Sequence, residues 1–271
     1  MKILLLGDVM GRVGREAVLK YVPELRVTLK LDFVVVNGEN ASHGFGLAPD
    51  MADAFFAAGA DVVTLGNHAW DRREIIPYIA TQNRLLRPLN YPPGTPGQGA
   101  VLVPLADGRK VLVAQAIGRL FMDPLDCPFR AVDDLLARHK LGVTTHAIVL
   151  DIHAEASSEK MAFAHAFDGR VSCVTGTHTH IPTGDAQVLP LGTAYQTDLG
   201  MCGDYDSVIG MQKAPAMGKF IRKLPGDKLA PAEGPATLCG AVVETDDATG
   251  LAKSIQPLRL GGRLAYAMPA F

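Results

Sequence analysis

The feature that most constrains the fold is a repeated arrangement near the N-terminus, in which a short apolar run ends in polar residues and a helical pattern follows. Strands that alternate with helices in this way indicate a layered α/β sheet that is mostly parallel. Pro23 is expected to kink or break the first helix. The apolar runs predict strands at Lys2–Gly7, Asp32–Asn37 and Asp61–Leu65, and the spacing of apolar residues predicts helices at Gly14–Lys30, Pro49–Ala58 and Asp71–Thr81.

The remaining sequence is more antiparallel in character. Asp107-Gly108 and the segment 246–250 are strong hairpin signals between apolar runs. The segment Pro215–Pro235 is rich in Pro, Gly and Lys, and it is expected to be a long surface loop. Further strands are expected at Ala100–Pro104, Lys110–Ala116, His146–Leu150, Val171–Thr175, Cys239–Thr245 and Ser254–Leu258, strand and turn at Leu189–Thr197, and helices at Val132–Lys140 and Glu159–Phe167.

The sequence contains no internal repeat and no convincing linker, so residues 1–271 are interpreted as a single α/β domain with mixed β-sheets flanked by α-helices. With 26 basic and 28 acidic residues, the formal net charge is −2. A chain with this balance has no electrostatic surface for gripping long nucleic acid, although metal ions would still allow it to hold a small anion.

The chain has four cysteines and none of them forms a C-x-x-C pair, which is typical of reduced thiols in a cytosolic protein. Asp8 interrupts the first apolar run too early for a signal peptide, and no run is long enough to span a bilayer. These observations predict a cytoplasmic protein without a membrane partner. A homo-oligomer is compatible with the sequence, because such assemblies are common among soluble proteins.

Five expected strands end in residues that can bind metal ions. In open α/β sheets, ligands bind beyond the carboxyl ends of the strands, so these side chains are expected to converge on one crevice. Most of the loops carry a glycine just before the polar residue, which lets the backbone approach closely. The residues are Asp8, then Glu39 with Asn40, then Asn67 with His68, then His153, and finally His178 with His180.

The ligand types in this set indicate more than one metal ion. Imidazole, carboxylate and amide groups suit Mn, Fe, Zn or Co, whereas thiolates dominate structural zinc sites. Three histidines, two carboxylates and an amide exceed what one tetrahedral ion needs. They match two neighbouring ions that share a bridging carboxylate, an arrangement that clamps a phosphoryl group and activates water for attack.

Each residue of the set also has a simpler interpretation when it is taken alone. Asp8 would serve as a cap near a helix start, and Asn67 as a turn residue. A single histidine such as His153 is more often hydrogen-bonded within the structure than bound to metal. His43, close to Glu39, is either a contact to substrate phosphate or a solvated loop residue. Caps and turns do not explain five such residues at five strand ends, so the metal-site interpretation is preferred.

The fuller motifs resemble a known superfamily. The strings at Gly7–Arg15, Asn37–Ala41, Gly66–Asp71, Gly176–Thr183 and Thr197–Gly203 are similar to those of the calcineurin-like metallophosphoesterases. Within that superfamily they look like the bacterial YmdB-type family, described as 2′,3′-cyclic-nucleotide 2′-phosphodiesterases. The similarity runs from residue 3 to about residue 211. It implies the layered metallophosphoesterase fold, in which mixed sheets are flanked by helices.

The resemblance also implies roles for single residues. His68 would be the catalytic acid, or would hydrogen-bond to the phosphoryl group. Met10 replaces the usual histidine ligand, and a thioether is a poor ligand for these ions. Glu39 replaces the usual bridging Asp. The first ion would be held by Asp8, Glu39, Asn40 and His180, and the second by Glu39, Asn67, His153 and His178.

The expected activity is therefore that of a two-metal phosphodiesterase, which converts a 2′,3′-cyclic nucleotide to a nucleoside 3′-phosphate through a metal-bridging hydroxide. The expected cofactors are two divalent or trivalent transition-metal ions, with iron preferred and manganese or zinc as alternatives. Two other functions stay open: a metal-loaded regulatory protein that senses nucleotides or RNA ends with little turnover, and a phosphomonoesterase. The presence of His68 beside a full ligand set favours the enzyme.

Overall fold

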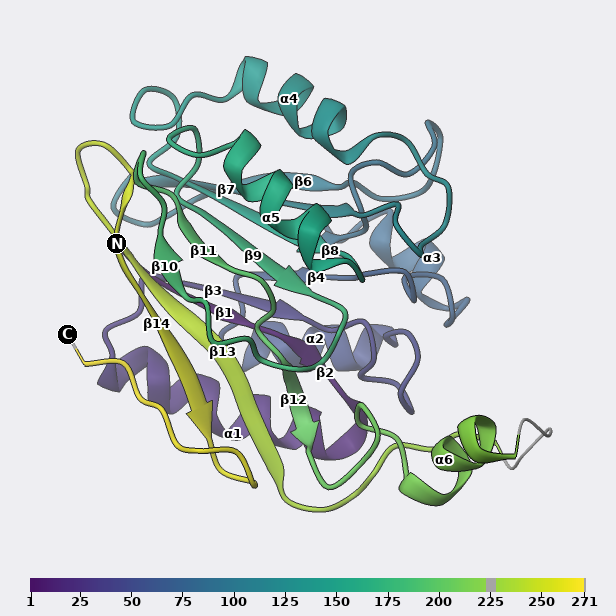
Figure 1. The fold of residues 1–271 in the computed structure, drawn as a ribbon. Helices are drawn as coiled ribbons and strands as arrows, with labels where there is room; N and C mark the ends of the chain where they lie inside the picture. The colour runs from purple at the N-terminus through teal and green to yellow at the C-terminus, as the bar shows by residue number, and fades with distance from the viewer. Residues whose placement is uncertain (223–227, 271) are drawn as a thin grey trace.

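The computed structural model describes residues 1–222 and 228–270. Two β-sheets pack face to face, and helices cover both outer faces (Figure 1). The first sheet contains β1 (Lys2–Leu6), β2 (Asp8–Val9), β3 (Phe33–Asn37), β4 (Val62–Thr64), β5 (Leu85–Leu86), β12 (Met201–Asp204), β13 (Ala236–Thr245) and β14 (Ala252–Leu260). The second contains β6 (Ala100–Pro104), β7 (Lys110–Ile117), β8 (Ala147–His153), β9 (Cys173–Thr177), β10 (Gln187–Val188) and β11 (Ala194–Gln196).

Both sheets are mixed, which confirms the predicted fold class. In the first sheet the strand order is β2-β12-β13-β1-β3-β4-β5, with β14 paired to β13. The stretch from β1 to β5 is parallel, as predicted, whereas β13 runs antiparallel to β1. In the second sheet the order is β10-β11-β9-β8-β7-β6, and the strands from β7 through β9 to β11 are parallel.

The helices are α1 (Gly11–Thr28), α2 (Pro49–Ala57), α3 (Ile75–Ile79), α4 (Pro128–Arg138), α5 (Ser157–Ala166) and α6 (Lys213–Ile221). Helices α1 and α2 lie against the first sheet, and α4 and α5 lie against the second (Figure 1). None of the helices in the described ranges is long and apolar enough to cross a bilayer.

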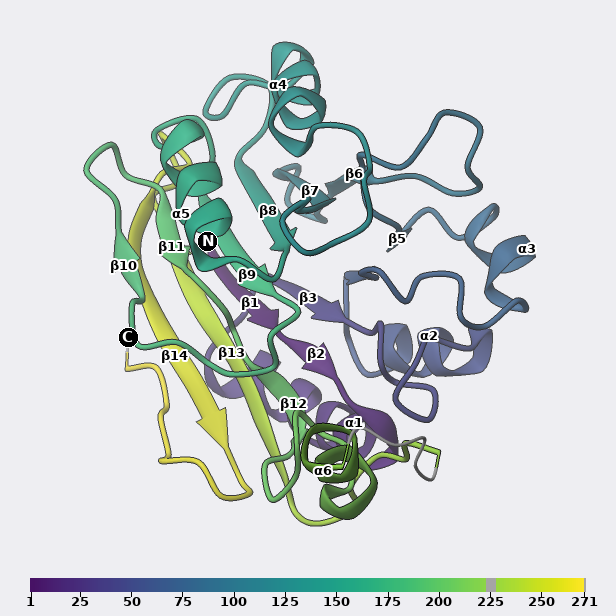
Figure 2. The same cartoon turned by 45° about the vertical axis from the view of Figure 1, so that its right-hand side comes forward.

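Alternation along β1 produces the layered core. Leu4 and Leu6 face the helices of the first sheet, while Ile3 and Leu5 face the second sheet. All four are at most 2% exposed, and each such side chain contributes roughly 1.5–3 kcal/mol relative to an exposed one. The carboxyl ends of β1, β3, β8 and β9 meet at the centre of the molecule, as the gathered arrowheads in Figure 2 show.

Helix α1 corrects the expectation for Pro23. The helix runs without interruption from Gly11 to Thr28 and includes the proline. Pro23 cannot donate a hydrogen bond to the carbonyl of Leu19, but Leu19 is exposed, so water can satisfy that carbonyl. Burial of Val18 and Val22 in the core holds the helix together on its other face.

The segment expected to be a helix at Asp71–Thr81 is helical only at Ile75–Ile79. The side chains of two residues before this helix form hydrogen bonds with the loops that precede it. Asp71 bonds to the His68 ring, and the Arg72 guanidinium donates to the carbonyls of the 40–46 loop. Pro77 lies inside α3 and lacks the N–H that a longer helix would use.

The expectation of a surface loop over Pro215–Pro235 is wrong for its first part, where Lys213–Ile221 forms α6. Pro215 is the third residue of this helix, where a backbone N–H has no intrahelical partner, so proline is tolerated there. Residues 223–227 lie outside the described ranges. Residues 228–230 are irregular, as expected.

A buried ion pair ties α5 to the loops at the sheet ends. The ammonium group of Lys160 lies 2.7 Å from Asp198 Oδ2 and 2.8 Å from the Thr177 carbonyl. Asp198 also accepts hydrogen bonds from Thr179 and from the Gly200 N–H. Both charged side chains are at most 1% exposed, so neither can be solvated if its partner is lost.

We predict that Lys160→Met destabilises the fold by about 3–5 kcal/mol, because it leaves the Asp198 carboxylate buried without a counter-charge. The measurement is urea denaturation followed by circular dichroism. Asp133→Asn is the matched control, since it removes the exposed Arg170–Asp133 pair and should cost about 1 kcal/mol or less. Equal losses for the two variants would contradict a special role for the buried pair.

Candidate metal centre

The metal-binding residues expected at the strand ends do meet in space. His153 lies at the centre of this cluster: its Nε2 is 3.2 Å from Glu39 Oε1 and 2.9 Å from Asn67 Oδ1. His178 Nδ1 lies 3.0 Å from the same nitrogen. In the first sheet, Asp8 begins β2, and Glu39 and Asn67 follow β3 and β4. In the second sheet, His153 ends β8 and His178 follows β9. The two sheets therefore build the cluster together, at the carboxyl ends of their parallel strands.

Two groups within the cluster have the spacing that an ion requires. The first consists of Asp8, Glu39 and His180, and the second of Glu39, His153 and His178. In each group the candidate ligand atoms lie within 4.8 Å of one another. Glu39 belongs to both groups, so this one carboxylate lies within reach of the other candidate ligands of each. A centre that held two ions would need a residue in such a position.

Two oxygen atoms in the cluster support binding of a cation. Asp8 Oδ1 and Asn40 Oδ1 are buried and have no hydrogen-bond partner. The other oxygen of Asp8 accepts a hydrogen bond from the His178 N–H, and the Asn40 amide nitrogen donates to the Gly44 carbonyl. A buried acceptor without a partner costs free energy, and a bound cation would remove this cost. The donor set thus fits the metal ions that the family resemblance implies.

Hydrogen bonds on the outer side of two histidines direct the inner nitrogen of each ring into the cluster. Thr177 Oγ1 donates to Asp151 Oδ1 at 2.8 Å, so it accepts from His153 Nδ1 at 2.9 Å. His180 Nδ1 donates to the Ile209 carbonyl at 2.8 Å. In the neutral form of each ring the proton therefore sits on the outer nitrogen, and Nε2 is the nitrogen that would bind a metal.

His178 is oriented in the opposite sense. Its Nε2 faces Glu155 Oε2 at 3.2 Å, so its Nδ1 points toward the cluster. The backbone of both histidines of this loop is strained, with φ of 99° at His178 and 67° at His180. Non-glycine residues rarely adopt these angles, and such strain is typical of binding sites. The buried Lys160–Asp198 pair stabilises the loop in this conformation.

Electrostatics within the cluster reflect two carboxylates in an apolar interior. Burial raises the pKa of Asp8 well above its usual range, and the adjacent Glu39 raises it further. Burial also acts to raise the pKa of Glu39, but the charge of His153 outweighs it and lowers this pKa to about 2. Burial acts to lower the pKa of His153, but Glu39 raises it to about 9. The carboxylates therefore need a neighbouring positive charge.

The pKa values of the other two histidines move in the opposite direction. Burial, together with the nearby charge of His153, lowers the pKa of His178 to about 3. Burial likewise lowers the pKa of His180. Both rings are neutral near pH 7 as a result, and neutral imidazole is the form that binds a metal.

His68 lies beside the cluster but outside both groups of candidate ligands. Its Nδ1 is 2.8 Å from Asp71 Oδ2, and its ring packs edge-on against Phe45 with centroids 5.2 Å apart. Its side chain is 27% exposed, so substrate can reach it. Its ring is in neither group of candidate ligands, and its role as the catalytic acid stays a prediction.

Met10 and His43, which the sequence analysis also considered, are in neither group of candidate ligands. Met10 is 1% exposed and packs in an apolar cluster with Met201 and Met211, so its thioether takes no part in the site. His43 is exposed on the 40–46 loop. The sequence analysis did not identify Asp71, Asp151 or Thr177. Of these three, only Asp71 could have been found from the sequence, because it stands three residues after His68 and is close enough along the chain to contact its ring.

Comparison with known proteins identifies the family. A family model described as YmdB-like protein matches residues 4–258. The chain belongs to the YmdB-like protein family. Its member from Bacillus subtilis (strain 168), a 2′,3′-cyclic-nucleotide 2′-phosphodiesterase, is 45% identical over 256 residues, which cover 94% of this chain and 96% of that protein. The family predicted from the motifs is therefore confirmed.

Two solved structures share the fold of this YmdB-like protein. A hypothetical protein from Thermus thermophilus is 42% identical with a TM-score of 0.90, covering 97% of this chain and 100% of that one. A novel phosphatase from Mycoplasma pneumoniae is 31% identical with a TM-score of 0.89, covering 96% of this chain and 93% of that one. The similarity thus extends over the elements that carry the candidate metal centre.

Gly66 provides a test of how tightly the cluster is packed. A Cβ atom at this position would collide with Glu39 Oε2 and with the ring of His153. We predict that Gly66→Ala weakens Mn²⁺ binding at least about tenfold, a change of about 1.4 kcal/mol, measured by isothermal titration calorimetry. Gly184→Ala is the control, because a Cβ there meets nothing within 4 Å. Unchanged Mn²⁺ affinity in Gly66→Ala would show that the site can open without loss.

Proposed function

We propose that this YmdB-like protein is a metal-dependent phosphodiesterase that opens 2′,3′-cyclic nucleotides to nucleoside 3′-phosphates. The observation that carries the proposal is the position of Glu39 in both groups of candidate ligands. The name of the Bacillus subtilis relative, a 2′,3′-cyclic-nucleotide 2′-phosphodiesterase, supports the choice of substrate.

The residues would divide between two ions as the family resemblance implies. When bound, the ions supply Lewis acidity toward the phosphoryl oxygens and an activated water as nucleophile. The unpartnered oxygens of Asp8 and Asn40 support their assignment as ligands. The first ion is assigned to Asp8, Glu39, Asn40 and His180, and the second to Glu39, Asn67, His153 and His178.

His68 is assigned to the leaving group. Water adds to phosphorus, the bond from phosphorus to the 2′ oxygen breaks, and that oxygen must gain a proton. The hydrogen bond to Asp71 holds the His68 ring through Nδ1, so Nε2 is the nitrogen that can donate this proton. Phe45 packs against the ring and limits its rotation. The product keeps its phosphate on the 3′ oxygen.

Several expectations from the sequence stay predictions. They are iron as the metal, with manganese or zinc as alternatives, a cytoplasmic location, one domain over residues 1–271, and assembly into a homo-oligomer. Metal analysis of the purified protein would decide the first of these, and sedimentation would decide the last.

The proposed activity is tested with 2′,3′-cyclic AMP and protein loaded with manganese or iron. We expect 3′-AMP as the product, separated from 2′-AMP by chromatography. Tight binding without turnover would instead favour a nucleotide-sensing protein. Hydrolysis of phosphomonoesters alone would favour a phosphatase.

We predict that His68→Asn lowers kcat by about 10²–10⁴-fold, which is the usual contribution of a general acid. Its metal content should equal that of the wild type, because the ring is outside both groups of candidate ligands. Plasma mass spectrometry gives the metal content. His165→Asn, on an exposed face of α5, is the control. Loss of metal in His68→Asn would make this residue a ligand and would refute its assignment as an acid.

We predict that Glu39→Gln loses ions from both positions, since one carboxylate serves both. Mass spectrometry of the native protein reports the number of ions retained. Glu155→Gln is the matched control, because Glu155 contacts His178 from outside the cluster and should leave both ions in place. Retention of two ions in Glu39→Gln would exclude the bridging role.

A further inference from the structure

A basic cavity lies beside the candidate metal centre. Its volume is about 460 Å³. Three of its lining residues, His43, Arg72 and Lys228, have basic side chains, and none of the residues that line it is acidic. The walls between them are apolar and are formed by Phe45, Leu229, Ala230 and Pro231. Such a lining suits an anion that is attached to a less polar body.

Phe45 is the wall that the cavity shares with the candidate active site. Its ring lines the cavity and also packs edge-on against His68, with centroids 5.2 Å apart. The loop that carries it starts at the candidate ligand Asn40, and reciprocal hydrogen bonds of 3.1 Å join Asn40 to Gly44. The cavity is therefore separated from the proposed acid by one aromatic side chain.

The 40–46 loop presents His43 in a fixed position. Arg72 donates to the Ser42 carbonyl at 2.9 Å and to the Phe45 carbonyl at 3.2 Å, so it holds the loop on both sides of His43. His43 has a left-handed backbone, with φ of 53°, and its side chain is exposed. Within the described ranges, its ring has no hydrogen-bond or ion-pair partner, which leaves it available to a ligand.

The direction of the substrate follows from the proposed function, on which this inference rests. The 2′ oxygen that leaves phosphorus must lie at His68, so the ribose that carries it lies against His68 and Phe45. If the 5′ side of the same ribose faces Phe45, a group on the 5′ oxygen enters the cavity on the far side of this ring. A mononucleoside has only a hydroxyl group there, whereas an RNA end or a 5′-phosphorylated nucleotide has a phosphate.

We propose that the cavity of His43, Arg72 and Lys228 binds the phosphate on the 5′ oxygen of the terminal nucleoside, and that the enzyme prefers 2′,3′-cyclic substrates that carry this phosphate. A short single-stranded end fits a cavity of this size. It also agrees with the formal net charge of −2, which does not favour binding of long nucleic acid.

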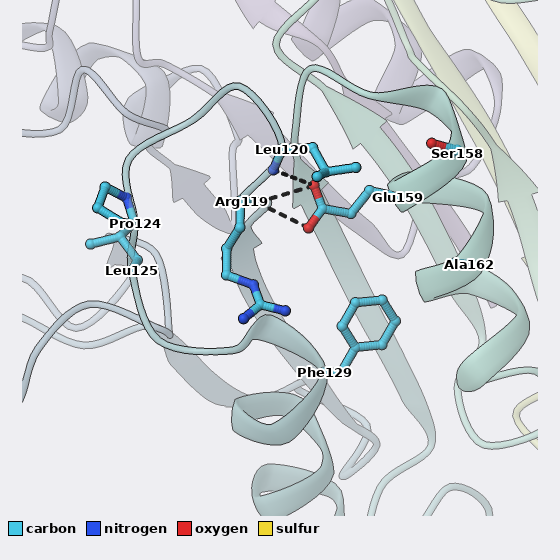
Figure 3. Close-up of a pocket in the computed structure, with 8 residues that line it drawn as sticks. All are labelled: Arg119, Leu120, Pro124, Leu125, Phe129, Ser158, Glu159 and Ala162. Carbon is cyan, nitrogen blue, oxygen red and sulfur yellow. Dashed lines mark hydrogen bonds between the residues drawn. The ribbon is translucent and has the colours of Figure 1, made fainter.

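A second cavity, of about 550 Å³, lies between the loop that carries Arg119 and Leu125 and helix α5 (Figure 3). It opens beside the end of β8, where the Gly118 N–H bonds to the His153 carbonyl. Glu159 accepts hydrogen bonds there from the backbone N–H groups of Arg119 and Leu120, and the Arg119 guanidinium extends between the loop and Phe129. One basic and one acidic residue line it, so it is less suited to phosphate and provides a control.

The experiment compares three substrates with metal-loaded protein: 2′,3′-cyclic AMP, its 5′-phosphorylated form, and an ApA dinucleotide that ends in a 2′,3′-cyclic phosphate. The measured quantity is the ratio of kcat/KM for each phosphate-bearing substrate to kcat/KM for 2′,3′-cyclic AMP. We expect a ratio of about ten or more for at least one of them, the size of one charge-assisted hydrogen bond. Preference for the dinucleotide identifies an RNA end, and preference for the 5′-phosphorylated form identifies a mononucleotide.

Two variants remove the proposed phosphate contacts. His43→Asn keeps a residue that tolerates the left-handed backbone, and Lys228→Gln removes the charge of the lysine. Each should lower the ratio toward one, while the control Arg119→Gln leaves it unchanged. Circular dichroism confirms that each variant is folded. A wild-type ratio near one, or a ratio that Arg119→Gln lowers as much as His43→Asn does, would overturn the proposal.

The test separates this proposal from the proposed function. If no substrate is hydrolysed, the proposed function fails, and the same ratio is then obtained from Kd values measured by calorimetry. Equal Kd values for the substrates with and without the 5′ phosphate would refute the phosphate cavity. Tighter binding of the phosphate-bearing forms would support it.

Discussion

The buried carboxylate of Glu39 is the constraint on which the site depends. It is 1% exposed and lies 3.2 Å from His153. A carboxylate in such a place is stable only with a compensating positive charge, because it has lost its hydration. His153 of the second sheet supplies part of that charge, and the proposed ions would supply the rest. The packing of the two sheets against each other therefore also assembles the residues of the site.

The surrounding structure fixes the donor atoms before any ligand arrives. Thr177 and the Ile209 carbonyl determine which nitrogens of His153 and His180 carry a proton. A buried ion pair stabilises the strained loop of His178, and the absence of a side chain at Gly66 leaves room for the two acceptors beside it. Preorganisation of this kind lowers the cost of binding, because few side chains must be ordered afterwards.

Local charge in this molecule differs from its net charge. The chain as a whole is close to neutral, yet the candidate metal centre gathers carboxylates and the neighbouring cavity gathers basic side chains. With the proposed cations bound to the carboxylates, a phosphoester with a second phosphate would be complementary to both regions at once. Recognition then depends on the separation of two small sites, and an extended basic surface is not required.

Parts of the fold were predictable from local patterns. Strands such as β3 are short apolar runs with clear ends, and such runs identify a buried strand whatever packs against them. The helix expected at Asp71–Thr81 was not correct, because Asp71 and Arg72 bond to residues outside that segment. The position of β13 between β12 and β1 was not predictable from the sequence either. That pairing joins the two ends of the chain, and no local signal encodes it.

The sequence by itself determined the chemical identity of the donor groups and their order along the chain, since residue type and strand ends are local properties. Only the tertiary structure decided that Glu39 faces two groups of ligands, that Met10 turns away, and that His43 lines a separate cavity. The physical reason is that these relations are distances between atoms on different strands and loops. Such distances are set by how two sheets pack, and side-chain packing involves the whole molecule.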